Sequence, residues 1–417
     1  MQSLIINGGR RLAGTLSVHG AKNSVLPLIS ATILLNGKSI LHNCPKLSDV
    51  SAALDIVKSL GLSGAQNGSD IEIISSDTDT FQIPDDLMRR MRSSVMFLGS
   101  ILARHNRAVI STPGGCMLGP RPIDIHIKSL SKLGVTVIES NGRLEFSAEN
   151  GLVGTDITLD FPSVGATENL ILASVKAQGT TTIYNAAREP EIKDLSDFLN
   201  KAGANISGSG TDTIKITGVK ELSGVEYTVM PDRIEAATYM AAVAVTGGEL
   251  KLKGVEPNHL LSVNSVLREA GCEINCDNNS LSLFAPLRLK SVKTIRTQPF
   301  PGFPTDVGPL LISALSSAEG TTVFYENIFE NRYSFVDELK RFGANVETHG
   351  PVAVVNGARS FSPADCDCTD LRGGAALVIA ALKASGKSRI NKLCHINRGY
   401  QDIAENLRSL GADVYYS

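Results

Sequence analysis

One cysteine lies in a segment that is too rich in glycine and proline to form a helix or a strand. Residues 111–122 read STPGGCMLGPRP, with three glycines and three prolines around Cys116. We predict an exposed loop with a thiol near its tip, and an exposed thiol indicates a chemical use. Arg121 follows five residues later and is placed to stabilise a thiolate or to hold an anion beside it. The loop alone leaves open the alternative of an incidental cysteine.

The other cysteines give a weaker signal. They stand at positions 44, 272, 276, 366, 368 and 394. Cys366 and Cys368 form a Cys-x-Cys pair without a second Cys or His pair at metal-site spacing, and a zinc site usually needs four ligands. We therefore expect no metal, and we interpret the remaining cysteines as core or near-core thiols. An odd number of cysteines in a long chain favours a reducing cytosol over a disulfide framework.

A second set of candidate groups stands at the beginnings of six apolar, helix-like segments. Four of the six are cations, although the helix dipole disfavours a cation in the first turn. If the six helix N-termini face one cleft, their free N–H groups and the cationic side chains form an anion site, which predicts a substrate with several negative charges. For Ser163, Asp306 and Asp370 the alternative is a simple helix cap. The six equivalent residues are Lys22, Arg92, Ser163, Arg233, Asp306 and Arg372.

An internal repeat of about 70 residues positions these groups. Six times, a helix-like segment ends in an apolar residue and a glycine, which is a favoured residue just past a helix because it tolerates the left-handed conformation. Short alternating segments around a polar turn follow most of these glycines, as in GANISGSGTDTIKITG at 203–218, and predict a hairpin. The glycines are Gly61, Gly134, Gly203, Gly271, Gly343 and Gly411.

The length and the repeat together predict two domains of three units each. A chain of 417 residues is too long for one ordinary core. The segments between the glycines are apolar nearly all round, so we expect six buried helices with short sheets outside them. The split is expected near Thr228, and the N-terminal residues 1–21 are left over to complete the second domain.

Composition excludes several classes of protein. The 42% hydrophobic fraction predicts packed cores, and 40 basic against 42 acidic residues gives no indication of nucleic-acid binding. The N-terminal segment lacks the apolar region of a signal peptide, and no stretch has the ~18 apolar residues of a membrane span. The expected partners are therefore small molecules, with neither nucleic acid nor membrane, in the cytoplasm.

The chain resembles the UDP-N-acetylglucosamine 1-carboxyvinyltransferases of the enolpyruvyl transferase family over essentially its whole length. The loop with cysteine followed by Arg-Pro-x-Asp-x-His is the most specific feature. The resemblance rests on GAKN at 20–23, PGGCMLGPRPIDIH at 113–126, PSVGATEN at 162–169, NAAREPEI at 185–192, PDRIE at 231–235, PGFPTD at 301–306, ENRY at 330–333, TDLR at 369–372 and HINRGY at 395–400.

The resemblance implies a fold of two inside-out α/β barrel-like domains, each of three repeats with buried helices and outer short sheets. The first domain is residues 22–229, which carry the Cys116 loop, the second is 1–21 plus 230–417, and the active site is the cleft between them. The implied reaction is transfer of the enolpyruvyl group of phosphoenolpyruvate to the 3′-hydroxyl of UDP-N-acetylglucosamine, the first committed step of peptidoglycan precursor synthesis, without a cofactor.

The resemblance also assigns roles to residues. Cys116 is the acid, Asp306 the base, and Lys22 a third catalytic group. Lys22 and Asn23 open the phosphoenolpyruvate site, where Arg121 and Arg398 hold the phosphate and the carboxylate, with Arg372 close by. His126 is expected near the uracil, with a hydrogen-bonded structural histidine as the equal alternative. The expected UDP-sugar contacts are Arg92, Pro122, Ile123, Asp124, Ile125, Ser163, Val164, Asp306 and Ile328.

Two other readings compete with this one. The sister enzyme of the same fold transfers the same group to shikimate 3-phosphate, but it lacks the cysteine loop. A catalytically silent paralogue that binds UDP-sugar and regulates the pathway is the second alternative. The presence of Cys116, Lys22 and Asp306 argues against the silent form.

Overall fold

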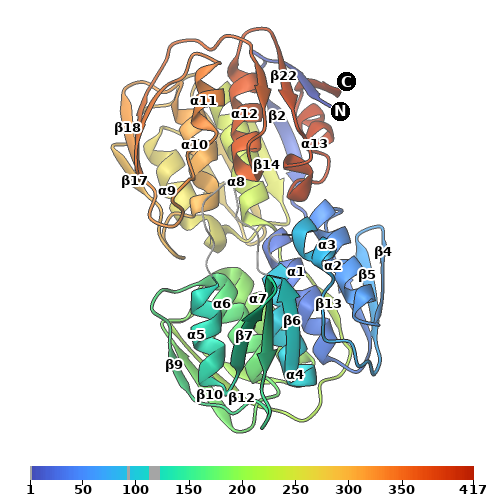
Figure 1. Ribbon diagram of the computed structural model, residues 1–417. Coiled ribbons are helices and arrows are strands. Elements are labelled where there is room, and N and C mark those ends of the chain that lie inside the picture. The colour runs from blue at the N-terminus through green and yellow to red at the C-terminus, as the bar shows by residue number, and fades with distance from the viewer. Residues whose placement is uncertain (1, 92–93, 112–122) are drawn as a thin grey trace. The chain divides into compact units, whose positions relative to one another are not determined.

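The chain folds into two compact units. The structure is a computed structural model that describes residues 2–91, 94–111 and 123–417. We call the described part of residues 20–230 the N-terminal unit, and residues 2–19 with 231–417 the C-terminal unit. Each unit holds three small sheets and several helices, so the prediction of a mixed α/β chain is confirmed (Figure 1).

The three sheets of the N-terminal unit are built from β3 to β13. Their strand orders are β13-β3-β5-β4, β6-β8-β7 and β11-β12-β10-β9. The strands are β3 (Gly37–His42), β4 (Ser63–Asn67), β5 (Asp70–Ser75), β6 (Arg107–Ser111), β7 (Thr136–Ser140), β8 (Arg143–Ser147), β9 (Asp156–Thr158), β10 (Thr180–Tyr184), β11 (Asn205–Ser207), β12 (Thr213–Thr217) and β13 (Glu226–Thr228). The helices are α1 (Lys22–Ala31), α2 (Ser48–Ser59), α3 (Asp85–Arg90), α4 (Phe97–His105), α5 (Asp124–Lys132), α6 (Val164–Ser174) and α7 (Pro190–Lys201), with 3₁₀ turns η1 (Thr32–Leu34) and η2 (Ser94–Met96).

The sheets of the C-terminal unit have the orders β15-β16-β14-β2, β17-β18-β20-β19 and β21-β22-β1-β23. The strands are β1 (Leu4–Asn7), β2 (Ala13–Ser17), β14 (Glu249–Lys253), β15 (Glu273–Cys276), β16 (Ser280–Phe284), β17 (Thr294–Arg296), β18 (Thr321–Tyr325), β19 (Asn345–His349), β20 (Val352–Asn356), β21 (Asp365–Asp367), β22 (Lys387–Asn391) and β23 (Asp413–Tyr416). The helices are α8 (Arg233–Thr246), α9 (Leu261–Glu269), α10 (Gly308–Leu315), α11 (Val336–Lys340), α12 (Leu371–Lys383) and α13 (Ile403–Ser409), with 3₁₀ turns η3 (Pro257–Leu260), η4 (Thr305–Val307) and η5 (Ile396–Arg398).

In the described part of the chain five of the six sheets share one four-stranded topology, and the sheet of β6 has the same order without the fourth, parallel strand. In the sheet of β10, that strand runs parallel to β9 and antiparallel to β12, and β12 pairs in turn with β11. Between β10 and β11 the chain forms the amphipathic helix α7 and then turns at Gly203. The equivalent glycines 61, 134, 203, 271, 343 and 411 all have positive φ, from +85° to +107°. The predicted repeat, its glycine caps and its hairpins are thus confirmed.

The N-terminal strands lie in the sheets of the C-terminal unit. β1 pairs antiparallel with both β22 and β23, so it fills a central place that the sixth repeat lacks. β2 runs parallel to β14 in the sheet of the fourth repeat. Long-range pairing therefore joins the two ends of the sequence, and the marked N- and C-termini lie close together in Figure 1.

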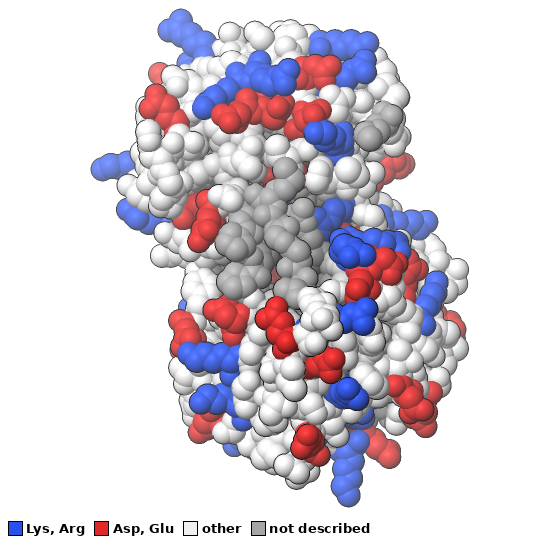
Figure 2. All heavy atoms as spheres, viewed as in Figure 1, with Lys and Arg blue, Asp and Glu red and all other residues white. Residues whose placement is uncertain are grey.

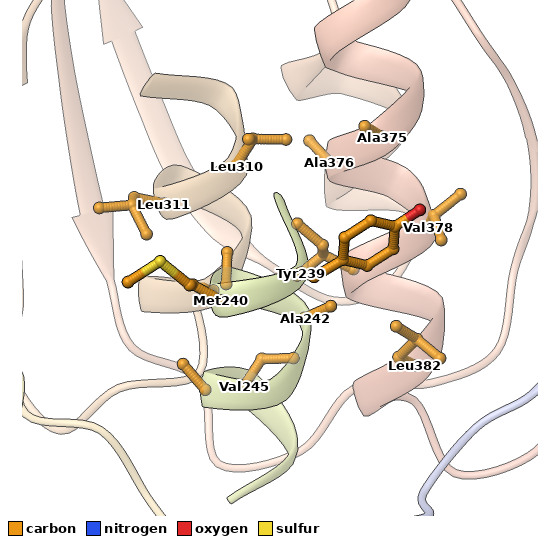
Figure 3. Close-up of a cluster of buried hydrophobic side chains, with 14 of the residues drawn as sticks. Tyr239, Met240, Ala242, Val245, Leu310, Leu311, Ala375, Ala376, Val378 and Leu382 are labelled. Carbon is orange, nitrogen blue, oxygen red and sulfur yellow. The ribbon is translucent and has the colours of Figure 1, made fainter. Parts of the chain in front are cut away.

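Apolar helices form the core of each unit. In the C-terminal unit α8, α10 and α12 contact one another, and nearly all of their residues are buried. Figure 3 shows Leu310 facing Ala375 and Ala376, where small side chains allow α10 and α12 to lie close. The hydroxyl of Ser313 donates to the Ala376 carbonyl at 2.6 Å, which satisfies a polar group inside this core. None of the helices in the described part of the chain has the length and apolar character needed to cross a bilayer.

In the N-terminal unit, α4 and α6 lie close together at Gly99. The Gly99 N–H donates to the side-chain oxygen of Asn169 at 2.6 Å. A Cβ on Gly99 would lie 2.4 Å from the backbone oxygen of Asn169. Because a backbone atom in a packed helix cannot move aside cheaply, this contact requires glycine.

We predict that Gly99→Ala lowers the free energy of unfolding by about 2–3 kcal/mol, since overpacking outweighs the gain of about 1 kcal/mol in helix propensity. Denaturant unfolding monitored by circular dichroism measures the change. Gly308→Ala is the matched control, because its added Cβ has no neighbour nearer than 4.0 Å. Because Gly308 is helical and precedes Pro309, where a Cβ is mildly disfavoured, this control should lose clearly less stability than Gly99→Ala. Equal stability of the two variants would contradict the close approach at Gly99.

Candidate active site

The carboxylate of Asp306 lies between two buried guanidinium groups in the C-terminal unit. Arg332 Nη2 donates to Asp306 Oδ1 at 2.6 Å. Arg372 donates to Asp306 Oδ2 through Nε at 3.2 Å and through Nη2 at 3.1 Å. The side chains of Arg332 and Arg372 are 2% and 4% exposed, whereas that of Asp306 is 26% exposed. The carboxylate is therefore the most exposed part of this cluster.

This pairing makes Asp306 a weak base. Burial raises the pKa of its carboxyl, but the charges and hydrogen bonds of Arg372 and Arg332 outweigh burial and hold that pKa well below its usual range. The interpretation of Asp306 as a helix cap is wrong, because no backbone N–H in η4 or α10 is capped by its side chain. The carboxylate is used for ion pairing instead.

A short loop after β18 holds Arg332 in place. The carboxylate of Glu326 accepts hydrogen bonds from the N–H groups of Ile328 and Phe329 and from the Thr305 hydroxyl, at 2.8, 3.1 and 2.9 Å. Arg332 Nε donates in turn to the Thr305 hydroxyl at 3.0 Å, and its guanidinium lies 4.8 Å from the centre of the Phe329 ring. Arg332 was missing from the residues that the sequence pointed to, although it lies inside the ENRY segment. Ile328, expected to contact the sugar nucleotide, lies half-buried in this loop.

The capped start of α12 positions Arg372. Asp370 is the N-cap of this helix, and its carboxylate accepts from the N–H groups of Arg372 and Gly373, both at 3.0 Å. The third donor of the guanidinium, Nη1, points to the hydroxyl of Tyr400 at 3.1 Å. Asp370 is thus a helix cap, as the alternative interpretation proposed. The cation of the same turn is Arg372, two residues later.

In the N-terminal unit, Lys22 is the first residue of α1 and is nearly buried. Its Nζ lies 2.7 Å from the Asp49 carboxylate, at the start of α2. The two side chains are 10% and 2% exposed. This pairing compensates a cation that would otherwise be disfavoured both by burial and by the helix dipole. The neighbouring Asn23 is exposed.

His126 is buried and neutral in the same unit. Burial lowers the pKa of His126 to about 4, although the charge of Asp124 acts in the opposite direction. The Asn169 side-chain oxygen is engaged by Gly99, so its amide nitrogen faces His126 Nδ1 at 3.0 Å. Nδ1 is then the acceptor, and Nε2 carries the proton. Nε2 lies beside Gly165, in the first turn of α6.

Five of the residues expected to contact the UDP-sugar lie at the starts of α5 and α6. Ile123 is the N-cap of α5, followed by the exposed Asp124 and the half-buried Ile125. α5 packs against α6, whose N-cap Ser163 accepts from the Ala166 N–H at 3.3 Å, with Val164 next to it. Within this unit the structure thus brings residues 123–126 next to 163–165. Ser163 is a cap, as one of the two readings proposed.

The structure leaves four of the expected site residues outside the described part of the chain, namely Arg92, Cys116, Arg121 and Pro122. Arg398 lies in η5 and is half-buried. Among the described residues, no group of three or more His, Cys, Asp or Glu side chains is arranged to hold a metal ion. Basic and acidic side chains are intermixed over the face that Figure 2 shows, so the cationic character found here is local.

We predict that the stability of the wild type falls by about 2 kcal/mol more between pH 7 and pH 5 than that of His126→Gln. Because the folded pKa of His126 lies below its unfolded value near 6.5, the unfolded chain takes up a proton first as the pH falls, and stability is lost. Denaturant unfolding at several pH values measures the difference. Parallel curves for the two proteins would show that His126 is not buried in its neutral form.

Comparison with known proteins places this arrangement in a family. The sequence model of the family described as EPSP synthase (3-phosphoshikimate 1-carboxyvinyltransferase) matches residues 6–407. The UDP-N-acetylglucosamine 1-carboxyvinyltransferase 2 of Caldanaerobacter subterraneus subsp. tengcongensis is 48% identical over 409 residues, which cover 98% of each chain. The UDP-N-acetylglucosamine 1-carboxyvinyltransferase of Trichlorobacter lovleyi is 44% identical over 414 residues, or 99% of each chain.

Solved structures agree on the fold. The enolpyruvyl transferase NikO of Streptomyces tendae superimposes with a TM-score of 0.89 at 24% identity, covering 100% of this chain and 99% of that one. An EPSP synthase from Acinetobacter baumannii gives a TM-score of 0.74 at 19% identity over 100% of both chains. The chain therefore belongs to the enolpyruvyl transferase family, among the UDP-N-acetylglucosamine 1-carboxyvinyltransferases.

Proposed function

We propose that this protein transfers the enolpyruvyl group of phosphoenolpyruvate to the 3′-hydroxyl of UDP-N-acetylglucosamine and releases phosphate. Relatives that are 42–48% identical over nearly the whole chain carry the name of this activity. The observation that carries the proposal is the Asp306 carboxylate held by two buried guanidinium groups, because it combines a proton acceptor with donors for an anion. The step commits precursors to peptidoglycan, and we propose that it takes place in the cytoplasm.

The proposed active site is the cleft between two inside-out, barrel-like domains of three repeats each, residues 22–229 and residues 1–21 plus 230–417. The support is that the candidate groups of both units stand at the starts of buried helices: Lys22 on α1, Ser163 at α6, Asp306 before α10 and Arg372 on α12. Helix N-termini offer unpaired N–H groups and a favourable dipole for anions, and both substrates are anionic.

The binding roles divide by substrate. We assign Lys22, Asn23, Arg121, Arg372 and Arg398 to the phosphate and carboxylate of phosphoenolpyruvate. The sugar nucleotide is assigned to the starts of α5 and α6, where His126 presents a neutral Nε2–H donor beside Gly165. A neutral donor suits a carbonyl oxygen, such as those of uracil. The assigned contacts are Arg92, Pro122, Ile123, Asp124, Ile125, Ser163, Val164, Asp306 and Ile328.

The proposed chemistry is addition followed by elimination. The sugar hydroxyl attacks C2 of the enol and loses its proton to Asp306, while Cys116 delivers a proton to C3. Loss of a proton from C3 then expels phosphate and restores the double bond. Cationic groups around C2 stabilise the charge that builds up on the departing phosphate.

The low pKa of Asp306 bears on the first of these steps. Before phosphoenolpyruvate binds, the charges and hydrogen bonds of Arg372 and Arg332 hold the pKa of Asp306 low, so this carboxylate attracts protons poorly. A bound phosphoenolpyruvate adds negative charge beside the same guanidinium groups, and a nearby like charge raises the pKa of a carboxyl. Binding of the anion therefore activates the base, so hydroxyl deprotonation is coupled to the presence of the second substrate.

We predict that phosphate is released from phosphoenolpyruvate only when UDP-N-acetylglucosamine is present, and that Asp306→Asn lowers kcat about 10²–10⁴-fold. A coupled assay for inorganic phosphate measures both. Asp413→Asn is the control, because it removes an exposed arginine-paired carboxylate of the same unit, 2.9 Å from Arg10, and should keep its turnover. Release with shikimate 3-phosphate instead would establish the sister activity, and full turnover of Asp306→Asn would remove Asp306 from the reaction.

We further predict that the epoxide fosfomycin alkylates Cys116 when UDP-N-acetylglucosamine is present. Burial raises the pKa of Cys44, Cys272, Cys366 and Cys368 to about 12, so these thiols should stay unmodified. Cys276 and Cys394 are exposed, so their interpretation as core thiols is wrong, and they are internal controls for non-specific reaction. Peptide mass spectrometry identifies the adduct, and its position on any cysteine other than 116 would contradict the assignment.

A further inference from the structure

Arg372 is held on two sides by different partners. Its Nε and Nη2 atoms donate to Asp306, and its Nη1 atom donates to the hydroxyl of Tyr400 at 3.1 Å. The centre of the guanidinium also lies 5.5 Å from the centre of the Tyr400 ring. Tyr400 is only 2% exposed, so its hydroxyl must find its partners within the protein.

Arg372, Tyr400 and Thr238 are linked by a chain of hydrogen bonds. The donor and the acceptor of each of these bonds follow from the chemistry of the groups. The Thr238 hydroxyl, on α8, donates to the carbonyl of Ile234 at 2.7 Å, which uses its one proton. At its 2.8 Å contact with Tyr400 it is therefore the acceptor, and the Tyr400 hydroxyl is the donor. Tyr400 is thereby left with an oxygen lone pair directed at Arg372, which has only protons to offer.

The hydrogen-bond chain ends at the capped start of helix α8. Ile234 lies in the first turn of α8, where the Asp232 carboxylate accepts from the N–H groups of Ile234 and Glu235 at 2.7 and 3.0 Å. Thr238 itself is 2% exposed inside the helical core. One run of hydrogen bonds thus connects the start of α8 with the start of α12 and, through Asp306, with the start of α10.

The arrangement leaves a defined part of the guanidinium available. A guanidinium has five N–H groups, and the bonds to Asp306 and Tyr400 use three of them. Within the described residues, no further contact occupies the second N–H of Nη1 or that of Nη2. Two N–H groups on neighbouring nitrogens match the spacing of two oxygens in a carboxylate or a phosphate.

We propose that Tyr400 and Thr238 are positioning residues, whose hydrogen-bond chain fixes Arg372 so that these two N–H groups face an anionic group of phosphoenolpyruvate. The inference rests on the proposed function for the identity of the anion. Without the Tyr400 hydroxyl, Nη1 loses its acceptor and the guanidinium is free to turn about its bond to Asp306. The two N–H groups on Nη1 and Nη2 are then no longer preorganised. The affinity for phosphoenolpyruvate falls, whereas the affinity for the sugar nucleotide changes little.

The test compares two buried tyrosines. Tyr400→Phe should raise the KM for phosphoenolpyruvate about 10- to 100-fold, the range expected for one hydrogen bond to a charged group. The Kd for UDP-N-acetylglucosamine, measured by calorimetry, should stay within about twofold of the wild type. Tyr239→Phe is the matched control, because Tyr239 is also 2% exposed and its hydroxyl accepts from Asn406, at 2.8 Å, rather than from Arg372. It should leave the KM for phosphoenolpyruvate unchanged.

The second link is tested at Thr238. Thr238→Val removes the acceptor for Tyr400 at nearly constant volume, and we expect the KM for phosphoenolpyruvate to rise in the same direction. Thr238→Ser keeps the hydroxyl and should restore most of the affinity. In the Tyr400→Phe background, Thr238→Val should add little, because both substitutions interrupt one chain.

Several outcomes would overturn the inference. If Tyr400→Phe weakened the binding of both substrates equally and also lowered the Tm, Tyr400 would only support the core. If its KM for phosphoenolpyruvate were unchanged, Arg372 would not need the Tyr400 hydroxyl to hold it in position. A crystal structure of the Tyr400→Phe variant reports the place of Arg372 without turnover, and an unmoved guanidinium would contradict the positioning role. Absence of phosphate release by the wild type would instead reject the proposed reaction, while a shifted Arg372 in that crystal would still establish the positioning.

Discussion

The C-terminal unit is organised around the pairing of one carboxylate with two guanidinium groups that are almost entirely removed from water. Taking an arginine out of solvent is costly unless its donors are satisfied and its charge is opposed. Asp306 opposes both cations, but it faces Arg332 and Arg372 as a single carboxylate. Such a cluster attracts further negative charge, which is what a phosphorylated enol and a nucleotide diphosphate provide.

The surrounding polar residues satisfy some of the donors that Asp306 does not reach. The Thr305 hydroxyl accepts a hydrogen bond from Nε of Arg332, and the Tyr400 hydroxyl accepts one from Nη1 of Arg372. Asp370 caps the helix on which Arg372 lies. Each of these residues lies at the start of a buried helix or next to one, because that is where the backbone leaves the apolar core and polar side chains are tolerated. The repeat therefore explains why the polar groups recur at one end of each core helix.

The N-terminal unit uses the same principle with other residue types. Lys22 is paired with the nearly buried Asp49, and His126 is fixed in one tautomer by Asn169, whose other amide atom binds Gly99. In each case the residue assigned to substrate is held by a partner that is more buried than itself or equally buried. Preorganised groups of this kind bind charge without first having to rearrange, which is the main source of electrostatic catalysis.

The repeat, the glycines that end the amphipathic helices, the hairpins after them and the apolar helices between could be predicted from the amino-acid sequence, because all of these follow from local conformational preference and from periodicity. The sequence also contained the short motifs that indicate the family. The roles of the polar residues at the helix starts became clear only from the folded structure. Ser163, Asp306 and Asp370 are equally plausible caps in the sequence, yet Asp306 binds Arg332 and Arg372, which stand 26 and 66 residues further along the chain. Pairing between such distant residues depends on how the starts of α10 and α12 pack against the loop after β18, and no local pattern records that packing.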